Sequence, residues 1–139
     1  MKTKKVEKGR KTQVKECLLT IVTTVDGQEN KTVKQAEGEF SLSQMQLTYR
    51  EENALVSLHL FNDRLEISRA GDYTLRLSLC QGETLKGVLG LGNAEGDISA
   101  HTHKLAYSYS KNSFMLMAHY TLYFGCETQD TKIRLQVKL

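Results

Sequence analysis

The chain has 139 residues, of which 40% are hydrophobic and 25% are charged, a composition that excludes a disordered chain and a membrane-embedded one. It contains no proline and no tryptophan, which excludes collagen-like, proline-rich and mucin-like proteins. The net charge is +3, and the length predicts a single domain that can bury a core without disulfide bonds.

Positive charge is concentrated in the first residues. Residues 1–15 contain seven Lys or Arg and one Glu, for a net charge of +6. The remaining residues contain 12 Lys or Arg and 15 acidic residues, for a net charge of −3. We therefore predict a basic arm, residues 1–13, followed by one domain, residues 14–139. Such an arm either docks on RNA or another anionic partner, here through residues 2–15, or is a solvated tail.

Three features predict a cytoplasmic protein without membrane contact. The basic N-terminus lacks the apolar stretch of a signal peptide. The longest apolar run, residues 114–118, is too short to cross a bilayer. Cys17, Cys80 and Cys126 are an odd number of cysteines without metal-ligand spacing, which fits free thiols in a reducing compartment.

From about residue 13 onward, apolar residues recur with a period of two, which is typical of β-strands. In residues 73–79, for example, three leucines alternate with polar residues. Glycines at positions 87, 90, 92 and 96 indicate a looser region. Turn signals separate the strands at residues 26–27, 51–53, 62–63, 71–72, 81–83, 111–112 and 125–130.

About ten short strands result, mostly joined by tight turns, and no segment predicts a helix of ordinary length. Hairpin connections favour a meander, in which each strand pairs with its neighbour in sequence. A meander of this length tends to close, because closure removes exposed strand edges. We therefore predict an all-β fold, an antiparallel up-and-down β-barrel of about 8–10 strands.

Strand parity assigns ten large side chains to the inside of this barrel. Two interpretations remain open, a packed apolar core without a cavity or a pocket for a small apolar or amphipathic ligand. The inward set is Leu58, Leu60, Ile67, Leu75, Leu77, Phe114, Leu116, Tyr120, Leu122 and Phe124.

Arg69 shares strand parity with Leu65 and Ile67, so its side chain should point inward or at the barrel rim. A partly buried guanidinium needs an anionic partner. That partner is either a ligand carboxylate or phosphate, or a structural ion pair with Glu51 or Glu52.

His101-Thr102-His103 places two imidazoles on one face of a strand, as barrel metalloenzymes of the cupin type present two metal ligands. His119 is a candidate third ligand on a neighbouring strand, but no carboxylate follows His103 until Glu127. The alternative is a pair of solvent-facing histidines.

No other motif predicts catalysis. The glycines of residues 87–92 are followed by no Gly-Lys-Ser/Thr and by no predicted helix on which a phosphate would sit. The chain has no Gly-x-Ser-x-Gly elbow, and its pattern places no carboxylate pair in the core. We therefore assign no catalytic residue and no cofactor.

The strand at residues 113–124 is apolar on both faces over much of its length. One face should belong to the core. The other, with Met115, Met117 and Tyr123, is either further core or a self-association surface for a homodimer.

Six short segments follow one another in order: TIVTTVDGQE (20–29), AEGEF (36–40), LTYREE (47–52), LEISRAG (65–71), LRLSLCQGE (75–83) and GDISAHTHKL (96–105). In this order they resemble the YwiB-like family of bacterial proteins of unknown function, from about Lys15 to the C-terminus. The resemblance implies a lipocalin-like, calycin-type β-barrel without an established enzyme activity. That family's Tyr-x-Glu and Arg-x-Gly patterns fall on Tyr49, Glu51, Arg69 and Gly71. The leucines within residues 87–92 and the His-Thr-His tripeptide depart from the family pattern.

Three functions follow as hypotheses. The first is a cytoplasmic binding barrel for a small hydrophobic or amphipathic anionic ligand, by analogy with calycin-type barrels. The second is a non-enzymatic interaction module that uses the basic arm on RNA or another anionic partner. The third is a metal-dependent, cupin-like enzyme that uses His101, His103 and His119. The ligand-contacting residues of the first hypothesis are Arg69, Tyr49, Leu58, Leu60, Leu77, Phe114, Leu116 and Tyr120.

Overall fold

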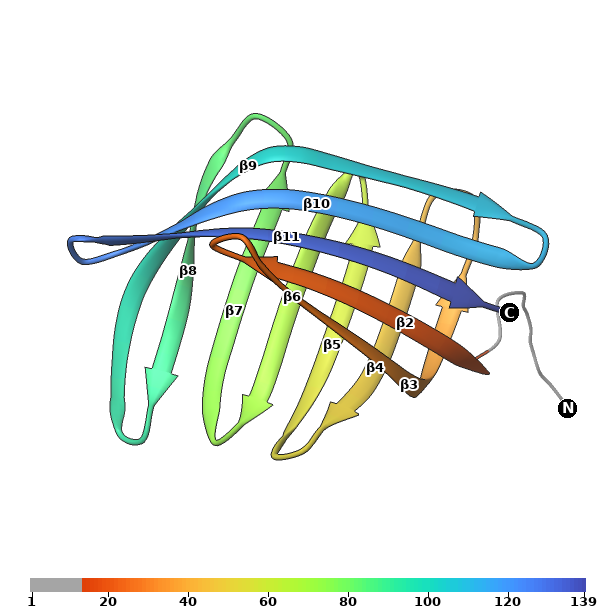
Figure 1. Cartoon of the computed structure of the whole chain (residues 1–139), viewed down its shortest axis with the longest axis horizontal. Coiled ribbons are helices and arrows are strands. Elements are labelled where there is room, and N and C mark those ends of the chain that lie inside the picture. The colour runs from red at the N-terminus through yellow and green to blue at the C-terminus, as the bar shows by residue number, and fades with distance from the viewer. Residues whose placement is uncertain (1–13) are drawn as a thin grey trace, which may run out of the picture.

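A computed structural model describes residues 14–139, and the predicted basic arm, residues 1–13, lies outside the described residues. Within residues 14–139, ten strands labelled β2–β11 form one closed antiparallel barrel (Figure 1). Each strand pairs with its neighbours in sequence, and the last, β11, pairs with the first, β2. The predicted up-and-down β-barrel is therefore confirmed. In this part of the chain, no helix has the length and apolar character needed to span a bilayer.

Tight turns connect the strands, and two of them have positive φ at both central residues. The φ angles are 48° and 86° at Asp26-Gly27 and 52° and 58° at Asn62-Asp63. This geometry matches the right-handed twist of paired strands, so both predicted hairpins are confirmed. The strands are β2 (Lys15–Val25), β3 (Gln28–Phe40), β4 (Met45–Glu51), β5 (Ala54–Phe61), β6 (Arg64–Gly71), β7 (Tyr73–Cys80), β8 (Thr84–Leu91), β9 (Ala94–Ser110), β10 (Ser113–Phe124) and β11 (Glu127–Lys138).

The glycine-rich region is a regular hairpin, and the prediction of a looser region was wrong. β8 pairs with β9 along its whole length, with a turn at Gly92-Asn93. A Cβ on Gly87 would collide with the carbonyl oxygen of Arg76 on β7. Glycine is required there because β7 and β8 approach closely, not because the chain bends.

The last strand begins earlier than the sequence predicts. Residues 125–130 carry turn signals, but the turn is Gly125-Cys126 and β11 begins at Glu127. The inward positions at this end of β11 are Gln129 and Thr131, which are polar. Apolar alternation therefore could not reveal the first part of the strand.

β9 is the longest strand and belongs to both halves of the barrel. It pairs with β8 from Ala94 to His101 and with β10 from Ser99 to Ser110. In Figure 1, strands β4–β8 run across the direction of β10, β11, β2 and β3, and β9 bends from one direction into the other. Its pairing with β10 contains a β-bulge, because His119 pairs with Lys104 and Tyr120 with Thr102, which leaves His103 as the extra residue.

The core lies inside the barrel and contains the residues that strand parity predicts. Leu75 and Phe124 of the predicted inward set are partly buried and pack against the core. The other eight are buried: Leu58, Leu60, Ile67, Leu77, Phe114, Leu116, Tyr120 and Leu122.

Candidate functional site

β3 and β4 pair over only a short segment of the barrel wall. Although β3 has 13 residues, it pairs with β4 only from Ala36 to Phe40. Where this pairing ends, a cleft of about 850 Å³ opens, which we call the β3–β4 cleft. This volume lies within the roughly 300–1,000 Å³ of small-molecule pockets. The lining combines the charged side chains of Glu16, Lys34, Glu37 and Arg50 with Ala36, Tyr49 and Leu55.

Two tyrosines connect this cleft with the interior. Tyr49 continues the inward row of Met45 and Leu47 on β4, and Tyr120 is buried on the inner side of β10. Burial raises the pKa of both phenols, and the proximity of Tyr49 raises that of Tyr120 further. Both phenols are therefore neutral hydrogen-bonding groups at pH 7, close to each other inside the barrel.

Tyr120 is the centre of a cross-strand row of inward hydroxyl groups, which we call the hydroxyl row. Its partners are Thr102 on β9 and Thr131 on β11. Thr102 is fully buried and Thr131 is 4% exposed, and neither hydroxyl has a hydrogen-bond partner among the described residues. A buried polar group without a partner costs about 1–3 kcal/mol. The two threonine hydroxyls of the row therefore have unused hydrogen-bonding capacity.

Arg69 lies at the rim, and its side chain is 11% exposed. Its Nε donates to Oε1 of Glu51 at 3.0 Å, its Nη2 lies 2.8 Å from Oδ1 of Asp72, and its Nη1 donates to the Tyr73 carbonyl at 2.8 Å. The structural ion pair with Glu51, one of the two predicted alternatives, is therefore present. These bonds use three of the five guanidinium N–H groups, and the guanidinium stacks on the Tyr73 ring with its Cζ 3.7 Å from the ring centroid. Glu51 raises the pKa of Tyr49 and Arg69 lowers it, so this rim cluster adjoins Tyr49.

The predicted aliphatic lining belongs to a densely packed part of the core. The ring of Phe114 packs against that of Phe40, with centroids 5.5 Å apart. Of the predicted ligand-contacting residues, the structure thus places Tyr49 at the cleft, Arg69 at the adjoining rim and Tyr120 in the hydroxyl row, while the others fill the core. Those others, Leu58, Leu60, Leu77, Phe114 and Leu116, are at most 6% exposed.

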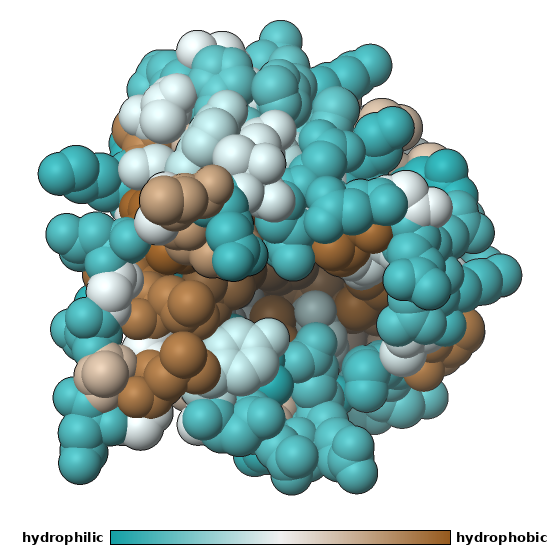
Figure 2. Space-filling view, turned by 60° about the vertical axis from the view of Figure 1, so that its left-hand side comes forward, coloured by the Kyte–Doolittle hydropathy of each residue, from teal (hydrophilic) through white to brown (hydrophobic). Residues whose placement is uncertain are grey.

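One side of the barrel is not fully closed over. Figure 2 shows, on the face that forms the left of Figure 1, a hollow lined by hydrophobic side chains and ringed by hydrophilic ones. Among the inward-facing residues, Leu75, Leu89 and Phe124 are only partly buried. The inner wall is therefore accessible in part, as a binding barrel requires.

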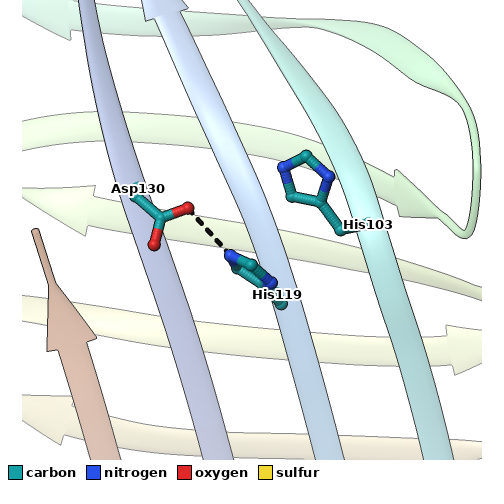
Figure 3. A group of neighbouring side chains, drawn as sticks. All are labelled: His103, His119 and Asp130. Carbon is teal, nitrogen blue, oxygen red and sulfur yellow. Dashed lines mark hydrogen bonds and ion pairs between the residues drawn. The ribbon is translucent and has the colours of Figure 1, made fainter. Parts of the chain in front are cut away.

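A second group of side chains, of types that bind metal ions, lies on the outer wall. His103 and His119 alternate with the buried Thr102 and Ala118, so their side chains point outward. The two rings lie 4.7 Å apart, and Nε2 of His119 is 2.8 Å from Oδ1 of Asp130 on β11 (Figure 3). The ligand atoms of His103, His119 and Asp130 all lie within 4.8 Å of one another.

This trio differs from the predicted trio of His101, His103 and His119. His101 lies outside the group, and its Nδ1 is 2.7 Å from the hydroxyl of Thr84 on β8. Asp130 was missed because the sequence around it reads as a turn. With the turn at Gly125-Cys126, His119 pairs with Lys132. Asp130 is two residues from Lys132 and therefore lies on the same face, diagonally across from His119. A correctly placed turn would thus have identified Asp130.

Met115, Met117 and Tyr123 also lie on the outer wall of β10. They are 43%, 43% and 42% exposed, so the interpretation of this face as further core was wrong. A homodimer through this face stays a prediction.

The sequence and the fold were each compared with known proteins. A search of curated proteins finds no match to the chain. The crystal structure of the ywiB protein from Bacillus subtilis is similar, with a TM-score of 0.78 and 10% sequence identity over 91% of this chain and 94% of that chain. At this identity the likeness shows a shared fold. The profile of a domain of unknown function, DUF1934, matches residues 18–135, and the chain therefore belongs to the DUF1934 family.

Proposed function

We propose that this chain is a non-enzymatic binding barrel for a small amphipathic, anionic molecule. The ligand enters through the β3–β4 cleft, and its polar group reaches the hydroxyl row. The observation that carries this proposal is the pair of buried hydroxyls, Thr102 and Thr131, without partners among the described residues. Apolar walls with a few convergent polar groups are what small-molecule sites have in common.

The energetic cost of these hydroxyls supports a role in binding. Valine has nearly the same shape as threonine and would leave no buried hydroxyl unsatisfied. We expect Thr102→Val to raise the free energy of unfolding of the ligand-free protein by about 1 kcal/mol. A core selected for packing alone gains nothing from threonine here, whereas a ligand that bonds the hydroxyl compensates for its cost.

Arg69 is the proposed anion anchor, because two of its N–H groups have no use among the bonds described above. Lys34 and Arg50 in the lining of the cleft add positive charge near the entrance. Glu16 and Glu37 in the same lining balance these two charges, which favours a ligand whose single anionic group is placed specifically over a polyanion.

Fluorescence titration of the full chain with anilinonaphthalene sulfonate, an amphipathic anion, tests the proposal. We expect saturable binding of one probe per chain, weakened about fivefold by Thr102→Val because one neutral hydrogen bond is lost. Thr121→Val on the outer wall is the control and should bind as the parent does. Absence of saturable binding, or equal affinity of the Thr102→Val variant, would overturn the proposal.

Two further comparisons locate the entrance and the anchor. Leu55→Gln changes the lining of the cleft, whereas Val33→Gln changes an exposed residue of β3 outside that lining. We expect only Leu55→Gln to weaken binding.

Arg69→Ala should weaken binding of the sulfonate more than that of neutral phenylnaphthylamine, and an equal effect on both probes would remove Arg69 as the anchor.

The role of the basic arm on RNA or another anionic partner stays a prediction, as does the cytoplasmic location. Residues 1–13 lie outside the described residues, and Lys15, the last basic residue of the segment, is an exposed residue at the start of β2.

A further inference from the structure

The outer wall of the barrel brings together three metal-ligating side chains from three adjacent strands. His103 comes from β9, His119 from β10 and Asp130 from β11, and Figure 3 shows the three converging on one patch of the wall. This patch lies outside the barrel, on the other side of the wall from the hydroxyl row. It is therefore independent of the proposed interior site.

The β-bulge in β9 is what brings His103 to this patch. His119 pairs with Lys104 and Tyr120 pairs with Thr102, so His103 is the unpaired extra residue. In a regular ladder, residues 102 and 104 would share one face, but Thr102 is buried and Lys104 is exposed. The bulge therefore turns both His103 and Lys104 outward beside His119. β-bulges commonly re-aim side chains next to functional sites.

Each ligand is already oriented by a hydrogen bond. Nε2 of His119 lies 2.8 Å from Oδ1 of Asp130, and Nε2 of His103 lies 2.8 Å from the hydroxyl of Thr121. The carboxylate of Asp26 accepts a 2.9 Å bond from the backbone N–H of Asp130, which fixes this end of β11. The Asp130 backbone is thus held in place, and an ion would take over the hydrogen bonds that now orient the two histidine rings.

The distances allow coordination after small side-chain adjustments. Two ligand atoms on a tetrahedral zinc ion are about 3.3 Å apart, given bonds of about 2.0–2.1 Å. The observed separations extend to 4.8 Å at most, and His103 is exposed, so its ring can leave the Thr121 hydroxyl and rotate toward the other two ligands. An ion would replace the hydrogen bond between His119 and Asp130 with two coordination bonds.

The chemistry of the donors selects the class of ion. Two imidazoles with one carboxylate suit Zn²⁺ and neighbouring divalent transition metals, whereas Ca²⁺ and Mg²⁺ prefer oxygen ligands. Lys104 and Lys132 are both exposed cross-strand partners of His119 and offset the charges of Asp26 and Asp130. Affinity therefore depends on the nitrogen donors, not on a general negative field.

We propose that His103, His119 and Asp130 form a binding site for one divalent transition-metal ion, of which zinc is the representative. Three protein ligands leave a fourth position for water or for a group of another molecule.

Calorimetric titration of the full, untagged chain with Zn²⁺ tests this site. We expect one ion per chain, and at least a tenfold loss of affinity in each of His103→Ala, His119→Ala and Asp130→Asn. His59→Ala, which removes a histidine from β5, is the control and should leave affinity unchanged. His101→Ala should lose much less affinity than these three variants, because the His101 ring contacts that of His103, with centroids 4.9 Å apart, but is not itself a ligand.

Co²⁺ provides a second readout, since the absorption of the bound ion reports its coordination by nitrogen and oxygen. Should a variant fail to fold, the parent protein alone decides, because a site of this kind raises its melting temperature with Zn²⁺ and not with Mg²⁺. No stoichiometric Zn²⁺ binding by the parent, or unchanged affinity in the His119→Ala variant, would overturn the proposal.

Discussion

At the scale of single residues, the burial of Tyr49 and Tyr120 makes the stability of the fold depend on pH. Each phenol keeps its proton in the native state, because burial raises its pKa. In the unfolded chain the same groups lose their protons near pH 10, the ordinary value for tyrosine. The native state therefore binds more protons than the unfolded state above this pH.

We predict that stability is fully present below about pH 10 and falls above it, by about 1.4 kcal/mol per pH unit for each phenol. Tyr49→Phe removes one such group and should reduce the difference in the free energy of unfolding between about pH 9 and about pH 11. Urea unfolding at both pH values measures this difference. Tyr123→Phe, on the outer wall, is the matched control, and an unchanged pH dependence in the Tyr49→Phe variant would contradict the prediction.

Sequence reasoning found the site residues whose place in an apolar alternation shows that their side chains point inward. Arg69 continues the apolar alternation of Leu65 and Ile67, so its inward direction could be predicted, together with its partner Glu51. Thr102 and Thr131 also continue inward rows of apolar residues, but their parity was not used. They are polar residues at inward positions, and a polar residue in a strand is ordinarily read as facing solvent.

At the scale of strands, the hairpin β7–β8 shows how a close backbone approach determines residue type. The Gly87 position has the carbonyl oxygen of Arg76 where a side chain would begin, with Cδ2 of Leu77 at 3.1 Å from the same point. A sequence cannot show this, because glycine also marks turns and bulges. That ambiguity is why the region reads as irregular before the strands are paired.

We predict that Gly87→Ala lowers the free energy of unfolding by about 1–3 kcal/mol, because the added methyl group forces β7 and β8 apart. Gly96→Ala on β9 is the control, since a Cβ there meets no atom within 4 Å. It should change stability by less than about 0.5 kcal/mol. Urea denaturation of both variants measures the effect, and equal stabilities would show that the close approach relaxes without cost.

At the scale of the whole molecule, β9 makes the two halves of the barrel mutually dependent. It completes the pairing of β8 on one side and of β10 on the other, with Ser99–His101 shared by both ladders. Neither half can detach without breaking a ladder of the other. Tight turns and alternation sufficed to predict the meander and its closure, but not that one long strand would bend to serve both halves.

We predict a single unfolding transition of the whole barrel. Far-ultraviolet circular dichroism and tyrosine fluorescence should give the same urea midpoint, because both halves lose structure together. Hydrogen exchange should give similar opening free energies for the central amides of β6 and of β2. Separate midpoints for the two optical probes would show that the halves are independent units.

The pairing of β11 with β2 also has a consequence for how the protein is made. The register joins Leu18 to Lys138, so the first strand waits for its partner until nearly the whole barrel has been synthesised. A nascent chain on the ribosome exposes the unpaired edge of β2 during this time, and exposed edges attract other chains. A product of premature termination that lacks β11 never closes the ring. We therefore expect such fragments to keep an unpaired β2 edge that chaperones and proteases recognise.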